Sequence, residues 1–168
     1  MTSPAVSETP HRSATATPHR SLTARAWGLA PTAVAILRIG TGLLFMQHGL
    51  QKLFGLFGGF GGTPGATAPL MSQMGLAGVL ELGGGLLLVL GLFVRPVALI
   101  LLIEMIVAYV MAHLPRHPLP IQNDGELALL YGLIFFYLAA RGAGPVSIDA
   151  RQGRDEPRRM PHEKARAA

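Results

Sequence analysis

The residues of this chain that are best suited to chemistry are ionisable groups placed in or beside strongly apolar segments. They are Arg38, His48, Lys52, Glu81, Glu104, His113 and Glu126. An ionisable group inside a bilayer costs about 2.5–3.5 kcal/mol on insertion scales, so such groups need partners and usually mark functional sites. Histidine and glutamate accept and release protons, whereas lysine attracts anions or donates hydrogen bonds. Their combination predicts a membrane-embedded site that handles protons and binds a small polar compound.

Four hydrophobic segments must position these residues. They span Ala33–Phe57, Leu70–Val94, Val97–Leu114 and Leu127–Ala140. Half of the 168 residues are hydrophobic, and of the 23 charged residues, 14 basic and 9 acidic, only ten lie between Ala26 and Ala150. The first three segments suit a hydrocarbon core of about 30 Å, whereas the fourth reaches only about 21 Å at 1.5 Å per residue. The expected fold is all-α, a bundle of four transmembrane helices with disordered polar termini. The fourth span either takes Asp124–Glu126 into its first turn or sits partly in a protein-lined pocket.

The chain is expected to divide into three regions. Residues 1–26 form a disordered cytoplasmic segment, 27–149 a four-helix membrane domain, and 150–168 a charged cytoplasmic tail. Basic residues concentrate in both terminal regions and at Arg95 and Arg141, whereas Arg116 is the one basic residue in a loop on the other side. The positive-inside rule therefore predicts a multi-pass protein of the bacterial inner membrane with both termini in the cytoplasm.

Arg38 and Glu104 are expected at similar depths near the cytoplasmic side. At 1.5 Å per residue, Arg38 lies about 7–8 Å inside the first segment and Glu104 about 10 Å inside the third. Opposite charges at matching depths predict a buried structural ion pair, and the simplest role of such a pair is to fix the register of the helices.

A second polar cluster is expected nearer the outer side. His48, Glu81 and His113 lie about 19–24 Å from the cytoplasmic ends of their helices, and Glu126 begins the fourth helix on the same side. One face of the first helix is polar at this level and carries Gln47, His48, Gln51 and Lys52. Lipid does not accept such a face, so it is expected to point into the bundle.

The residues around Glu81 favour a close helix contact. They are Ala77, Gly78, Gly84 and Gly85, and small residues let another helix approach closely. Such an approach would bring His48 or Lys52 to the Glu81 carboxylate. The cluster could be a structural polar network, a ligand or redox pocket, or a metal or haem site.

Composition excludes or disfavours several classes of function. With no cysteine, the chain has no disulfide, no thiolate zinc site, no cysteine-ligated iron–sulfur cluster and no thiol nucleophile. None of the four hydrophobic segments contains a Glu-x-x-His pair of the kind that builds carboxylate-bridged metal centres, so no metal site is expected. The net charge of +5 is better explained by membrane topology than by nucleic-acid binding, which is not expected.

Motifs in all four segments carry a family resemblance. They include Gln47-His48-Gly49-Leu50-Gln51-Lys52-Leu53-Phe54-Gly55, Glu81-Leu82-Gly83-Gly84-Gly85, His113-Leu114-Pro115 and Glu126-Leu127-Ala128-Leu129-Leu130. Over roughly Ala33–Asp149 the chain resembles the DoxX family. The resemblance implies a four-helix inner-membrane protein, and related members are membrane subunits of thiosulfate:quinone oxidoreductase or are linked to terminal quinol oxidation. By position, the family's recurrent polar residues correspond to Arg38, His48, Lys52, Glu81, His113 and Glu126.

The leading functional hypothesis is a membrane subunit that supports quinone-linked oxidation of a small reduced compound, such as a sulfur oxyanion. His48, Gln51, Lys52 and Glu126 would bind the substrate or the quinone, which is a co-substrate rather than a covalently bound cofactor. Glu81 and His113 would move protons. Besides the lipid bilayer, the expected partners are a redox subunit or a second copy of the chain. The alternatives are a non-enzymatic scaffold for a soluble redox or stress-response partner, and a small-solute carrier, which would have to dimerise.

Overall fold

The structure, a computed structural model, describes residues 22–155, and every regular element in that range is helical. The long helices are α1 (Leu22–Phe54), α2 (Gln73–Leu90), α3 (Val94–Ala108) and α5 (Glu126–Arg141). The short elements are the 3₁₀ turn η1 (Phe60–Gly62), the π-helical turn η2 (Tyr109–His113), and the helices α4 (Pro120–Asn123) and α6 (Ile148–Arg151). The prediction of an all-α fold is confirmed over the described residues.

Three spans are long and apolar enough to cross a membrane: Leu29–Phe54, Gln73–Leu90 and Val94–His113. Three of the four predicted spans therefore meet this criterion. The helix α5 has 16 residues, about 24 Å at 1.5 Å per residue, which is shorter than a hydrocarbon core of about 30 Å. It begins at Glu126, so of the segment Asp124–Glu126 only the last residue joins its first turn.

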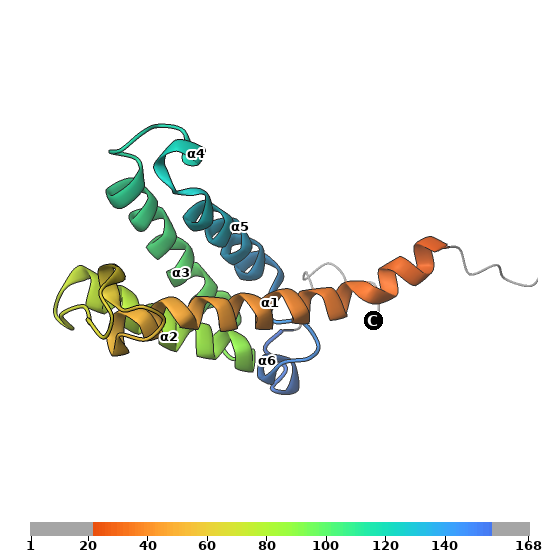
Figure 1. Cartoon of the computed structure of the whole chain (residues 1–168). Helices are drawn as coiled ribbons and strands as arrows, with labels where there is room; N and C mark the ends of the chain where they lie inside the picture. The colour runs from red at the N-terminus through yellow and green to blue at the C-terminus, as the bar shows by residue number, and fades with distance from the viewer. Residues whose placement is uncertain (1–21, 156–168) are drawn as a thin grey trace, which may run out of the picture.

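The four long helices are arranged as two antiparallel pairs. The helix α1 packs mainly along α2, and α3 packs mainly along α5. Figure 1 shows the α3/α5 pair leaving the α1/α2 pair at an angle, with α6 near the end where the two pairs meet. Side chains from both pairs form one apolar core, which includes Phe45, Leu88, Leu101 and Phe135.

Glycines bring α1 and α2 into close contact near Glu81. A Cβ atom added to Gly49 would lie 2.6 Å from the backbone nitrogen of Leu82, and one added to Gly85 would lie 2.8 Å from the carbonyl oxygen of Gly42. Only glycine permits this separation of the two backbones. The expected close approach of a second helix at Glu81 is confirmed, and it sets α1 and α2 at the distance that Lys52 needs to reach across.

Arg38 is fully buried and joins three parts of the chain. Its guanidinium donates hydrogen bonds to the carbonyl oxygens of Leu88 and Val89, the second at 3.0 Å, at the C-terminal end of α2. It also donates to the carbonyl oxygens of Ala143 at 3.1 Å and Val146 at 2.5 Å, in the segment after α5. The last carbonyls of a helix lack partners within it and carry partial negative charge, so a buried guanidinium is stabilised there.

The predicted ion pair between Arg38 and Glu104 is wrong. All the hydrogen bonds of Arg38 go to backbone carbonyls, and both carboxylate oxygens of Glu104 lack a hydrogen-bond partner among the described residues. The predicted depth of Glu104 was counted from Val97, whereas α3 begins at Val94. Glu104 therefore lies about 15 Å along α3, well above the helix ends that Arg38 contacts.

The C-terminal segment is part of this helical assembly up to Asp155. The carboxylate of Asp149 accepts hydrogen bonds from the backbone nitrogens of Phe93 at 2.9 Å and Val94 at 2.8 Å, and so caps the N-terminus of α3. Asp155 accepts from the backbone nitrogens of Ala143 and Gly144 at 3.1 and 2.7 Å. The prediction that the charged tail begins at residue 150 is therefore wrong, because these carboxylates satisfy backbone N–H groups of the bundle.

The other terminal boundary also differs from expectation. The helix α1 begins at Leu22, inside the segment 1–26 that was expected to be disordered. The helix continues outward from the apolar span, with Pro31 inside it. Residues 1–21 and 156–168, which carry the rest of both terminal predictions, lie outside the described residues.

Asp149→Ala is expected to lower the free energy of unfolding by about 1–2 kcal/mol, because it removes the cap and the negative charge at the N-terminus of α3. The melting temperature of the full chain in detergent micelles measures this loss. Asp149→Asn keeps one oxygen acceptor and should lose less. Arg151→Ala, an exposed change two residues away, is the matched control; equal melting temperatures for Asp149→Ala and Arg151→Ala would contradict the capping role.

Candidate functional site

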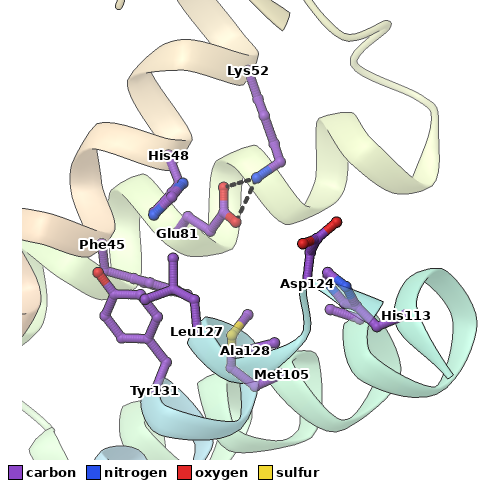
Figure 2. Close-up of a pocket in the computed structure, with 11 residues that line it drawn as sticks. Phe45, His48, Lys52, Glu81, Met105, His113, Asp124, Leu127, Ala128 and Tyr131 are labelled. Carbon is purple, nitrogen blue, oxygen red and sulfur yellow. Dashed lines mark hydrogen bonds and ion pairs between the residues drawn. The ribbon is translucent and has the colours of Figure 1, made fainter. Parts of the chain in front are cut away.

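A buried ion pair links α1 to α2. The Nζ atom of Lys52 lies 2.6 Å from Oε1 and 2.7 Å from Oε2 of Glu81, and Glu81 is 5% exposed. Lys52 belongs to the last turn of α1, where a positive charge is also stabilised by the helix dipole. An ammonium group has three N–H donors, so the two bonds to Glu81 leave one for a ligand. Figure 2 shows Lys52 reaching from α1 to the carboxylate on α2.

The ion pair borders a cavity of about 200 Å³ between the two helix pairs, which we call the inner cavity. Its polar lining comes from α1, α2, α5 and the turns that follow α3 and α4, and consists of His48, Lys52, Glu81, His113, Asp124 and Tyr131. Its apolar lining consists of Phe45, Met105, Ala108, Leu127 and Ala128. The structure therefore brings together four of the predicted site residues, His48, Lys52, Glu81 and His113. The catalytic roles assigned to them stay predictions.

Aromatic rings hold His48 at the wall of the inner cavity. Its ring lies edge-on to Phe45, with centroids 6.4 Å apart, and perpendicular to Tyr131, with centroids 6.1 Å apart. Phe45 and Tyr131 pack on each other at 5.0 Å. A half-buried imidazole between two rings keeps a fixed orientation, so its polar edge can meet a small molecule in the cavity.

The loop after α3 fixes His113. Asn123 is fully buried and donates from Nδ2 to the carbonyl oxygen of His117 at 2.7 Å, while its own backbone oxygen lies 2.9 Å from Nδ1 of His113. Because a carbonyl only accepts, the proton of the imidazole at that contact is on Nδ1, and in the neutral ring Nε2 is the acceptor. His113 closes the π-helical turn η2, which takes one more residue per turn than an α-helix.

Two predicted binding residues do not reach the inner cavity. Gln51 donates from Nε2 to the carbonyl oxygen of Phe57 at 3.3 Å and so supports the turn after α1. Glu126 is exposed and lies on the outer surface of α5. The buried face of α5 carries Ala128 and Tyr131, and Glu126 is two residues, about 160°, from Ala128 around the helix. The inclusion of Gln51 and Glu126 in the site is therefore wrong, and Gln47 is likewise exposed.

Sequence reasoning missed two polar groups of the inner cavity. Tyr131 has a side chain that is 7% exposed, and its position three residues after Ala128 on the apolar face of α5 was the available signal. Asp124 has a left-handed backbone, with φ of 58°, and its exposed carboxylate lies 3.9 Å from a guanidinium nitrogen of Arg116. Nothing in the sequence indicates that this loop residue borders the cavity.

The arrangement suits hydrogen bonding and proton exchange with a small molecule. Within residues 22–155 no group of three or more His, Asp or Glu side chains is placed to hold a metal ion. The buried and half-buried polar groups instead form a charge-balanced set, in which Lys52 faces Glu81, with one imidazole on either side, and the exposed carboxylate of Asp124 lies beside Arg116. Such a set can donate to and accept from a ligand without bringing a net charge into the membrane.

Comparison with known proteins supports the resemblance seen in the sequence. A family model described as DoxX matches residues 33–114, which carry four of the site residues, from His48 to His113. A protein of Haemophilus influenzae with the name "Uncharacterized protein" is 41% identical over 122 residues, which are 71% of this chain and 90% of that relative. No solved structure matches the chain. With its three apolar helices of membrane-spanning length, the chain belongs to the DoxX family of membrane proteins.

Proposed function

We propose that this chain is a subunit of the bacterial inner membrane that supports quinone-linked oxidation of a small reduced compound held in the inner cavity. The observation that carries the proposal is the convergence of Lys52, Glu81, His48 and His113 on one cavity. A purely structural polar network would pair these groups with one another and leave no space between them. A cavity of about 200 Å³ is below the range of about 300–1,000 Å³ that holds drug-sized ligands, so it suits a small ion or molecule.

The proposed topology has four spans with both termini in the cytoplasm. The helix α5 supports it by the apolar side chains on its outer face, since Leu133 is 67% and Phe136 is 62% exposed. These side chains need lipid rather than water beside them. The inner cavity then opens toward the outer side, near the loop that carries Asp124.

Binding of the reduced compound would depend on hydrogen bonds more than on net charge. Glu81 already neutralises Lys52, so an anion in the inner cavity would meet one free N–H of the ammonium group and the polar edge of His48. For thiosulfate, two ions join through a new S–S bond to give tetrathionate and release two electrons. The quinone takes up these electrons and two protons and becomes a quinol. With no cysteine in the chain, the electrons pass directly between substrate and quinone or through another subunit.

Inner-membrane vesicles from cells that overproduce the full chain test this proposal. Thiosulfate-dependent reduction of a short-tailed quinone should be several-fold faster than in vesicles that contain the His48→Phe variant, which keeps the aromatic packing but removes the ring nitrogens. Equal rates in wild-type, His48→Phe and empty vesicles would contradict the proposal.

The scaffold alternative predicts a different pattern. Removal of residues 156–168 would then abolish recovery of a soluble partner, while Glu81→Gln would leave the phenotype intact. The deletion must begin after Asp155, because the carboxylates of Asp149 and Asp155 cap backbone groups of the bundle.

A further inference from the structure

A second cavity lies on the other side of the Lys52–Glu81 ion pair. It has a volume of about 330 Å³ and runs between α2 and α3; we call it the α2–α3 groove. Apolar side chains form most of its lining, and those of Leu76, Ile100 and Ile103 are 50–58% exposed. In a membrane these exposed side chains face acyl chains, so the groove is accessible from the lipid.

Glu104 is the unexplained polar group of this groove. Both of its carboxylate oxygens are buried, and neither has a hydrogen-bond partner among the described residues. A buried carboxyl group without a partner is stable in hydrocarbon only in its neutral form, which has an O–H to donate. The groove therefore contains a hydrogen-bond donor that no protein atom in the described range uses.

We propose that the α2–α3 groove binds the ring of a lipid-soluble quinone, with the neutral carboxyl group of Glu104 donating a hydrogen bond to a ring carbonyl. This inference rests on the proposed function and names the place where the electron acceptor binds. The hydrocarbon tail of the quinone leaves the groove past Leu76 and Ile103 into the lipid.

The depth of Glu104 selects a neutral ring over a phospholipid headgroup. Glu104 lies about 14–15 Å from either end of the span Val94–His113 at 1.5 Å per residue. That position is close to the bilayer midplane, which a charged headgroup does not reach. A fatty-acid carboxylate is disfavoured as well, because Glu81 already neutralises Lys52, the one cation that lines the groove, and leaves no net positive charge for it.

The ion pair then lies between the two bound molecules. Lys52, Glu81 and Ala108 line both the inner cavity and the α2–α3 groove. The reduced compound on one side gives up two electrons, and the quinone on the other side takes them up with two protons. Glu104 and the ion pair are the proton-exchanging groups beside the quinone, and solvent at the outer opening of the inner cavity replaces their protons.

Photolabelling of the purified full chain with an azido-substituted, short-tailed benzoquinone tests the inference. Peptide mass spectrometry should place the label on α2 between Gln73 and Leu80 or on α3 between Ile100 and Val107. Ala77→Phe fills the groove and should reduce labelling at least tenfold. Val79→Phe places the same aromatic ring on the opposite, lipid-facing side of α2, where Val79 is 50% exposed, and should leave labelling unchanged.

Two substitutions of Glu104 isolate its hydrogen bond. Glu104→Gln keeps an N–H donor and should stay within about threefold of wild type in labelling, whereas Glu104→Leu should weaken it about tenfold. Glu104→Leu should melt at or above the wild-type temperature, because it removes an unpaired buried polar group, and Glu104→Gln should melt close to it, because it exchanges one neutral polar group for another.

The outcomes separate this inference from the proposed function. Label on Phe45 or His48 of α1 or on Tyr131 of α5, which line the inner cavity and not the groove, would overturn the α2–α3 groove as the quinone site and leave the proposed function standing. Equal labelling of wild type, Ala77→Phe and Glu104→Leu would also overturn it. Absence of saturable labelling in the wild type would overturn both.

Discussion

Replacing Lys52 by methionine is expected to lower the free energy of unfolding by about 3–5 kcal/mol. The substitution keeps the apolar stem of the side chain and removes its charge, so the carboxylate of Glu81, 5% exposed, is left buried without its partner. The double variant Lys52→Met/Glu81→Leu should recover most of that loss, since an apolar pair of similar volume often replaces a buried ion pair without a penalty. Denaturant titration of the two single variants and the double variant in micelles measures this coupling.

An exposed ion pair on the same side of the molecule is the matched control. Arg116 and Asp124 lie 3.9 Å apart, and their side chains are 62% and 88% exposed. Arg116→Met is expected to change the free energy of unfolding by less than about 0.5 kcal/mol. If Lys52→Met has as little effect as Arg116→Met, the pair between α1 and α2 is not a buried interaction in the membrane protein.

Replacing Arg38 by leucine is the second large effect, an expected loss of at least about 3 kcal/mol. The side chain is fully buried and donates to four backbone carbonyls at the end of α2 and in the segment after α5. Each carbonyl left without a partner costs about 1–3 kcal/mol. The fraction of the full chain that elutes as folded protein after extraction in mild detergent, together with its melting temperature, measures the loss.

Arg38→Lys distinguishes the forked shape of the guanidinium from its charge. A lysine has one ammonium nitrogen and cannot reach carbonyls on two separate segments, so it should restore only part of the stability. Full restoration by Arg38→Lys would show that charge alone holds this end of the bundle. Unchanged stability of Arg38→Leu would contradict the role of Arg38 as the link between α2 and the segment after α5.

The sequence was sufficient to predict the long helices and the contact between Lys52 and Glu81 at the centre of the site. Apolar segment length predicted the positions of the long helices, and the glycines beside Glu81 predicted the close approach that lets Lys52 reach it. Both inferences depend on local properties, namely hydrophobicity and side-chain size. A buried charge also needs a partner at its own depth, and that requirement selects few candidates.

Two predictions about individual residues failed because the depth of a side chain in the membrane and its angle around the helix axis were misjudged. Arg38 and Glu104 seemed level because each depth was counted from the edge of an apolar segment, whereas α3 begins at Val94 and α1 at Leu22. Glu126 was included for its depth, but its angle on α5 directs it away from the face that carries Tyr131. Helix starts and rotations depend on tertiary packing, which a hydropathy pattern does not record.

Capping by the C-terminal segment is a third feature that the sequence did not reveal. Asp149 and Asp155 lie in a stretch without hydrophobic periodicity, which is typical of a solvated tail. Their carboxylates nevertheless accept hydrogen bonds from backbone groups near residues 93 and 143. A single carboxylate can fix such a segment without any apolar burial, so the pattern of hydrophobic residues gives no indication of it.

The central claim is that Lys52 and Glu81 form part of a reaction site. Quinone reduction by the Lys52→Met/Glu81→Leu double variant tests it most directly, because this variant separates the structural role of the pair, which holds α1 and α2 together, from a role in the reaction. The account predicts that vesicles with this folded, stable variant reduce the short-tailed quinone with thiosulfate no faster than vesicles without the protein. Reduction at the wild-type rate by the double variant would contradict the account and leave Lys52 and Glu81 a purely structural role.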